Sequence, residues 1–127
     1  MALGGEMKIG VDLDATITAY PEFFSMFTRA MSKAGHEIHV ITDRPPGTEI
    51  FIADQLGAYG IAYHTIKIAR DKAAYIVEEG ISVLFDDMDD YFVGLPESVA
   101  VFKTREHYNF DFEEQKWRCS AKTTKLL

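Results

Sequence analysis

Short apolar runs rich in β-branched residues alternate along the chain with longer stretches whose apolar positions recur every three or four residues. The short runs predict buried strands, and the longer stretches predict amphipathic helices. Strands that alternate with helices are typical of a parallel sheet covered by helices on both faces, joined by right-handed connections. The pattern therefore predicts an α/β domain with a Rossmann-like, three-layer architecture.

Five strands and three helices follow from this pattern. We expect the strands at residues 8–12, 37–42, 61–66, 82–85 and 98–102, and the helices at residues 21–34, 48–59 and 71–79. Pro21 suits the first turn of a helix, and Asp71 suits an N-cap. Gly35, Gly60 and Gly80 follow the three helical patterns and favour their termination.

The 127 residues fit one domain. We expect its core at residues 7–105, followed by a short helix and a loose tail at residues 106–127. No internal repeat or low-complexity block interrupts this organisation.

The composition limits which kinds of partner we expect and in which compartment we expect the protein. The formal net charge is −7, which disfavours sequence-independent binding to nucleic acid. No apolar run approaches the ~20 residues that span a bilayer, and the first residues lack the pattern of a signal peptide. Cys119 is the only cysteine, so no internal disulfide can form. We expect a cytoplasmic protein without a membrane segment.

Polar residues gather where the predicted strands end. Asp12 ends the first strand and Asp14 follows it, Thr42 ends the second, and Asp86 and Asp87 follow the fourth; Lys72 begins the helix that precedes the fourth strand. In open parallel sheets, ligands bind beyond the carboxyl ends of the strands at a topological switch. We therefore expect these side chains to share one site.

Their chemistry favours phosphoryl transfer assisted by a cation. Carboxylates that lie close together repel one another, and their hard oxygens favour Mg²⁺, which gives Asp12, Asp86 and Asp87 a metal-binding role. A carboxylate such as Asp12 can attack a phosphoryl group, and Asp14 can protonate the leaving oxygen. Thr42 and Lys72 can bind phosphate oxygens, and Arg44 can contact an anionic part of the substrate.

This set resembles the four signature motifs of the haloacid dehalogenase superfamily over about residues 8–104. It consists of Asp12-Leu13-Asp14-Ala15-Thr16, then Thr42, Lys72 and Asp86-Asp87. The segments VITDRPP and HYN are weakly similar to the 5'(3')-deoxyribonucleotidase-like branch, so a nucleotide is one candidate substrate. The resemblance implies a sheet of order 5-4-1-2-3, Mg²⁺ and an aspartyl-phosphate intermediate on Asp12. It also implies that Asp14 is the acid/base, with its backbone carbonyl a further metal ligand beside Asp87.

Two departures from the family pattern shape the expectations. The family usually has glycine where this chain has Ala15. The chain also has only 25 residues between Thr16 and Thr42 and 29 between Thr42 and Lys72, too few for a cap domain. An open site would then need a large phosphorylated substrate, or a second subunit of a homo-oligomer, to cover it.

Two alternative hypotheses, neither of which involves catalytic turnover, remain beside the phosphatase hypothesis. A receiver-like phosphoacceptor domain would share the size and the acidic Mg²⁺ site, but it needs its acceptor aspartate at the end of the third strand. A phosphate- or Mg²⁺-binding module that has lost turnover is favoured by Ala15 and disfavoured by the presence of both Asp12 and Asp14.

Overall fold

A five-stranded parallel sheet forms the centre of the molecule. The computed structural model describes residues 5–118. The strands lie in the order β3-β2-β1-β4-β5, all neighbours parallel, which confirms the predicted order read from its other end. Their bounds are Lys8–Asp12 (β1), Glu37–Thr42 (β2), Thr65–Ile68 (β3), Val83–Asp86 (β4) and Ala100–Lys103 (β5).

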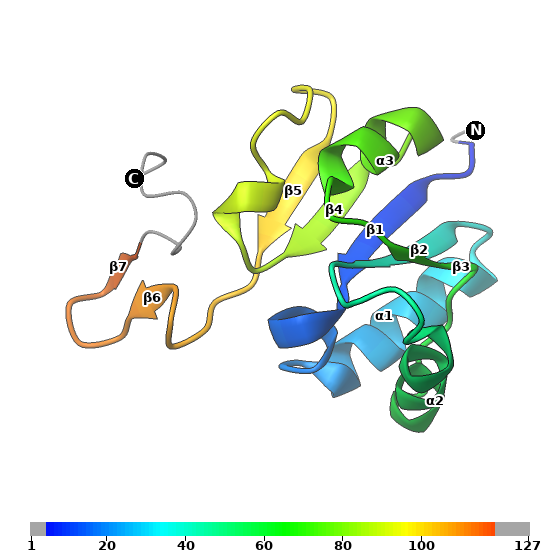
Figure 1. Cartoon of the computed structure of the whole chain (residues 1–127), viewed down its shortest axis with the longest axis horizontal. Helices are drawn as coiled ribbons and strands as arrows, with labels where there is room; N and C mark the ends of the chain where they lie inside the picture. Colours follow the sequence, from blue (N-terminus) through cyan, green and yellow to red (C-terminus); the bar gives the residue numbers. More distant parts are fainter. Residues whose placement is uncertain (1–4, 119–127) are drawn as a thin grey trace.

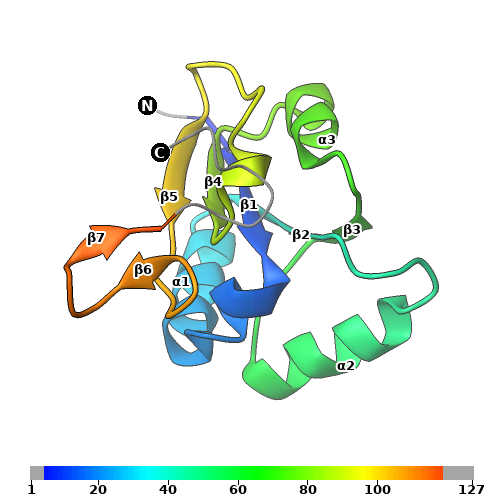
Figure 2. The same cartoon turned by 60° about the vertical axis from the view of Figure 1, so that its left-hand side comes forward.

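Helices cover both faces of the sheet. The helices are α1 (Pro21–Lys33), α2 (Glu49–Tyr59) and α3 (Lys72–Glu79). Figures 1 and 2 show α1 and α2 on one face of the sheet and α3 on the other. Two short helical turns, η1 (Leu13–Ile17) and η2 (Asp89–Tyr91), follow β1 and β4.

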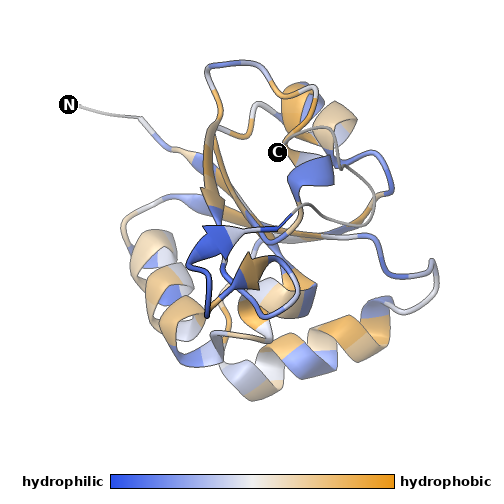
Figure 3. Ribbon diagram, turned by 90° about the vertical axis from the view of Figure 1, so that its left-hand side faces the viewer, coloured by the Kyte–Doolittle hydropathy of each residue, from blue (hydrophilic) through white to orange (hydrophobic). Residues whose placement is uncertain are grey.

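Alternation along the strands produces two cores, one on each face. Ile38 and Val40 of β2 pack in the larger core with α1 and α2, whereas Ile41 packs in the smaller core beneath α3. Successive side chains of a strand point to opposite faces of the sheet, so neighbouring residues of β2 contribute to different cores. The strands accordingly appear in hydrophobic colours between helices of mixed colour (Figure 3).

The helix ends follow the predicted signals. The side chain of Asp71 accepts a hydrogen bond from the backbone N–H of Ala74 at 3.1 Å, which confirms it as the N-cap of α3. Gly60 and Gly80 adopt the left-handed conformation that ends α2 and α3.

Two predicted elements are corrected by the structure. The third strand begins at Thr65 rather than at Ile61, because the buried Ile61 instead donates its N–H to Leu56 at the end of α2. Within the described part of residues 106–127 there is no helix, but an antiparallel hairpin of β6 (Phe110–Asp111) and β7 (Lys116–Trp117). Residues 119–127, the rest of the predicted helix and tail, lie outside the described residues.

No cap domain interrupts the described core. The chain between Thr16 and Thr42 forms α1 and β2, and the chain between Thr42 and Lys72 forms α2 and β3. Among residues 5–118, no helix has the length and hydropathy needed to cross a bilayer.

Candidate functional site

Three strand ends meet at the point where the chain changes direction across the sheet. From the central strand β1 the chain continues to β2 and β3 on one side, then crosses to β4 and β5 on the other. Asp12 ends β1 beside Ile41 of β2, and Asp86 ends β4 one residue after the Val11–Phe85 pair. Asp12, Thr42 and Asp86 therefore lie at one edge of the sheet, as predicted.

Lys72 joins the two strand-end carboxylates. Its Nζ lies 2.8 Å from Asp12 Oδ1 and 2.8 Å from Asp86 Oδ2. The Lys72 side chain is 0% exposed, and its Nζ also lies 4.1 Å from the centroid of the Tyr91 ring. Burial opposes the charge of Lys72, but Asp12 and Asp86 outweigh it and raise its pKa. The lysine is a fixed cation at the centre of the site.

The acidic groups form a site that suits a metal ion. One carboxylate oxygen from each of Asp12, Asp86 and Asp87 lies within 4.8 Å of the other two. Burial, followed by the charge of Asp12, raises the pKa of Asp86 to about 6. Burial and a hydrogen bond with Asp12 raise the pKa of Asp87 to about 9. More negative charge is gathered here than Lys72 alone offsets, and oxygen donors of this kind fit Mg²⁺.

The hydrogen bonds distinguish the two adjacent aspartates. Asp86 Oδ1 accepts the backbone N–H groups of Asp87 and Met88 at 2.8 and 3.2 Å, while its Oδ2 accepts from Lys72. Both oxygens of Asp86 are therefore occupied by protein donors. The carboxyl of Asp87 instead bonds to that of Asp12, another acidic group. This geometry favours Asp87 over Asp86 as the closer metal ligand.

A left-handed residue directs the chain after Asp12. Ala15 has φ 62° and ψ 12°, a conformation that glycine adopts more readily because it has no Cβ. The Ala15 N–H donates to Thr18 Oγ1 at 2.9 Å, and Thr16 Oγ1 donates back to Asp12 Oδ2 at 3.1 Å. The turn thus returns to hold Asp12.

Asp14 lies apart from the buried cluster. Arg44 donates from Nε to Asp14 Oδ2 at 2.9 Å and from Nη2 to Oδ1 at 2.7 Å. The Asp14 side chain is 53% exposed, and the hydrogen bond to Asp14 raises the pKa of Arg44. The structure therefore joins two of the predicted site residues that the sequence had given separate roles.

Thr42 is buried at the end of β2. Its Oγ1 accepts the backbone N–H of Arg44 at 3.3 Å, a bond that leaves the hydroxyl proton able to donate. Lys67, the other lysine close to α3 in the sequence, has its Nζ 5.5 Å from the centroid of the Tyr75 ring.

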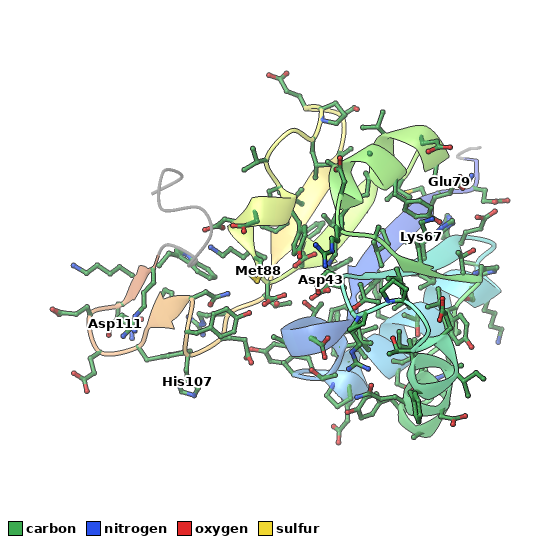
Figure 4. The ribbon with its side chains drawn as sticks, viewed as in Figure 1. Asp43, Lys67, Glu79, Met88, His107 and Asp111 are labelled. Carbon is green, nitrogen blue, oxygen red and sulfur yellow. The ribbon has the colours of Figure 1, made fainter. Side chains whose placement is uncertain are left out.

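A cleft adjoins Lys72 on the side of α3. It has a volume of about 390 Å³, and its walls come from the loop after β2, the start of α3 and the segment around η2. Tyr91 donates its hydroxyl to Asp43 Oδ2 at 2.6 Å across this cleft. Burial and this bond raise the pKa of Tyr91 far above its ordinary value. Asp43 and Met88 lie near the centre of the molecule, beyond the ends of the strands (Figure 4).

Two residues that contact the site were missed in the sequence. Thr104 Oγ1 donates to the carbonyl of Ala15 at 3.1 Å, and Asn109 Nδ2 donates to the carbonyl of Asp87 at 2.8 Å. Both lie far along the chain from their partners. Thr104 directly follows β5, so the rule that ligands bind beyond strand ends could have pointed to it. Asn109 follows no strand of the main sheet, and its signal was the HYN segment, which it ends.

Comparison of the chain with family models, with curated proteins and with solved structures finds no match.

Proposed function

We propose that this chain is a capless Mg²⁺-dependent phosphohydrolase of the haloacid dehalogenase type, which cleaves a phosphate monoester through an aspartyl-phosphate on Asp12. The observation that carries the proposal is the buried cluster of Asp12, Lys72, Asp86 and Asp87 at the switch point of the sheet. A buried lysine between two carboxylates, beside a third, unites a nucleophile, a phosphate-binding cation and a metal site in one place.

Each residue has a defined task in this scheme. Asp12 attacks phosphorus, and the bond from phosphorus to the ester oxygen breaks. Asp14 gives its proton to the departing oxygen and later removes one from a water molecule that attacks the same phosphorus. The bond from phosphorus to the Asp12 oxygen then breaks, and inorganic phosphate leaves. Lys72 and the Thr42 hydroxyl bind phosphoryl oxygens. Asp12 and Asp87 would hold Mg²⁺, which when bound neutralises negative charge and polarises the phosphoryl group.

The ion pair of Asp14 with Arg44 places a condition on the scheme. Arg44 occupies both oxygens of Asp14, whereas a general acid must present one of them to the leaving group. In the proposed cycle, Asp14 therefore leaves Arg44 when substrate binds. Arg44 is then available to an anionic part of the substrate.

The cleft beside Lys72 gives space for the leaving group. Its volume of about 390 Å³ is within the range of small-molecule sites, and Lys72 is one of its lining residues. A nucleotide is one substrate of suitable size. A second subunit or a large phosphorylated substrate would supply the cover that a cap domain gives in related enzymes.

A second candidate function is a phosphate- and Mg²⁺-binding module without turnover. The observation that favours it is the same ion pair, because Arg44 occupies both oxygens of Asp14. A receiver-like domain is disfavoured, since flavodoxin-like sheets have the order 2-1-3-4-5 and this sheet has β3-β2-β1-β4-β5.

A panel of phosphate monoesters assayed with the full chain tests the proposal. We expect Mg²⁺-dependent release of phosphate from the wild type, its loss in EDTA, and its loss in Asp12→Asn with the circular-dichroism spectrum retained. Asp87→Ala should raise the Mg²⁺ concentration required more than Asp86→Asn does. A wild type that binds Mg²⁺ and phosphate but releases none from any ester would support the binding module instead.

A further inference from the structure

The segment that follows β5 ties together the two loops of the site. We define residues 104–109 as the C-terminal clasp. Thr104 donates its N–H to the carbonyl of Asp86 at 3.0 Å, and its hydroxyl donates to the carbonyl of Ala15 at 3.1 Å. Its Oγ1 also lies 3.4 Å from Oγ1 of Thr16, the residue that bonds to Asp12. The clasp thus contacts both the turn after β1 and the turn after β4.

Asn109 makes the deepest contacts of the clasp. It is 1% exposed, and its Nδ2 donates to the backbone carbonyls of Asp87 at 2.8 Å and Thr104 at 2.9 Å. Its Oδ1 accepts the backbone N–H of Glu106 at 2.7 Å. The amide therefore uses two donors and an acceptor on three backbone groups, a set that neither a carboxylate nor an aliphatic side chain of the same size can match.

From these contacts we infer that Asn109 is a positioning residue for the metal site and acts by fixing the peptide of Asp87. The inference rests on the metal site of the proposed function but not on turnover. Asp87 is 4% exposed and follows directly after Asp86, whose carbonyl is held by Thr104. With its own carbonyl held by Asn109, the Asp87 backbone has little freedom, and its side chain stays near Asp12.

The physical reason is the electrostatic cost of the cluster. Carboxylate oxygens of Asp12, Asp86 and Asp87 lie within 4.8 Å of one another, and like charges this close repel unless a cation lies between them. A ligand that must stay near a like charge has to be held there by its backbone. Groups that orient metal ligands typically change metal affinity 10–100-fold when removed.

The test is the Mg²⁺ dissociation constant of the full chain, measured by calorimetric titration without substrate. Asn109→Asp keeps the size of the side chain and the acceptor for Glu106 but loses both donors. We expect it to weaken Mg²⁺ binding roughly tenfold or more. An added carboxylate would by itself strengthen binding, so the expected sign is opposite to that of simple charge.

Arg118→Ala is the matched control. It removes an exposed ion pair with Asp111, 3.2 Å long, and keeps the backbone N–H that Arg118 donates to the carbonyl of Asn109 at 2.8 Å. We expect its Mg²⁺ dissociation constant to stay near the wild-type value even if its melting temperature falls. An Asn109→Asp protein that is less stable but binds Mg²⁺ like the wild type would overturn the inference, because Asn109 would then only anchor the hairpin.

A measurement on the wild type decides the matter if Asn109→Asp does not fold. Because coupling between Mg²⁺ and the clasp is reciprocal, Mg²⁺ should slow hydrogen exchange at the backbone N–H groups of Thr104 and Asn109. It should not slow exchange at the hairpin turn, residues 112–115. If the wild type binds Mg²⁺ but hydrogen exchange in the clasp does not change, the inference about Asn109 is overturned and the metal site stands. If the wild type binds no Mg²⁺, the metal site is overturned as well.

Discussion

Two aspartates separated by one residue are each paired with a cation, and the two pairs differ in their surroundings. Lys72 and Asp12 meet at 2.8 Å with side chains 0% and 7% exposed, whereas Arg44 and Asp14 meet at 2.7 Å with side chains 24% and 53% exposed. We call them the buried pair and the exposed pair. Their distances are nearly equal, so burial accounts for the difference that we expect in their behaviour.

Burial makes one pair fixed and leaves the other free to exchange partners. Removal of one partner from a buried pair leaves an uncompensated charge without water, whereas an exposed pair is stabilised by little and is screened by salt. In the proposed cycle, Asp12 has to stay in place as the nucleophile, and Asp14 has to change both its proton and its partner. The two environments match these two requirements.

Lys72→Met should have the largest effect on folding. The change keeps most of the side-chain volume but leaves Asp12 and Asp86 without their cation, so the free energy of unfolding in EDTA should fall by about 3–5 kcal/mol. Urea denaturation measures this. The control is Lys67→Met, which removes an exposed lysine near Tyr75 and should change the same quantity by less than about 1 kcal/mol. Equal losses in the two variants would remove the distinction between buried and exposed cations.

Asp14→Asn should damage turnover while leaving stability nearly unchanged. Loss of the general acid should slow the hydrolysis of alkyl phosphates roughly 100-fold or more. Aryl phosphates should suffer less, because their leaving groups need less protonation. Steady-state kinetics with the two ester classes provides the comparison. Losses of equal size on both would count against proton transfer by Asp14.

Ala15→Gly tests the turn that separates the two aspartates. The left-handed conformation costs an alanine about 1–2 kcal/mol, while glycine loses about 0.5–1 kcal/mol more entropy on folding. The free energy of unfolding should therefore rise by about 0.5–1 kcal/mol. Ala30→Gly within α1 should lower it by about 1 kcal/mol, because the helix gains nothing from glycine. Two changes of the same sign would contradict the strain at Ala15.

Arg44→Gln should have the smallest effect. The exposed pair contributes less than about 1 kcal/mol to the free energy of unfolding, so the melting temperature should barely move. The kcat for alkyl phosphates should stay near the wild-type value, since Asp14 rather than Arg44 transfers the proton. A fall in kcat as large as that of Asp14→Asn would show that the two residues work as one unit.

Much of the sheet could be predicted because its signals are local. The buried runs of β1 and β2 contain β-branched residues. Gly60 and Gly80 end helices through their left-handed backbone conformation, and Asp71 begins α3 through a side-chain hydrogen bond. The predicted start of the third strand was wrong because Ile61 is buried where the chain leaves α2 and does not belong to a strand. The C-terminal helix was wrong because Phe110 and Trp117 face each other across a hairpin, at 5.1 Å between ring centroids.

The sequence predicted those site residues whose positions follow from the ends of the parallel strands, and it did not predict the others. Asp12, Asp86 and Asp87 come together because β1 and β4 are neighbouring parallel strands, and Lys72 reaches them from the start of α3. The partner of Asp14 could not be predicted, since the direction of its side chain depends on the left-handed turn at Ala15. The contacts of Asn109 join residues 22 positions apart through a backbone carbonyl, which leaves no pattern in side-chain chemistry.

The central claim is that Asp12 becomes phosphorylated, and borohydride trapping tests it most directly. The full chain is mixed with a hydrolysable phosphate ester and Mg²⁺, quenched with borohydride, which reduces an acyl phosphate to an alcohol, and digested for mass spectrometry. The account predicts homoserine in place of aspartate at position 12, and none in EDTA or when Asn replaces Asp12. Steady turnover with reduction at another aspartate, or at none, would contradict it.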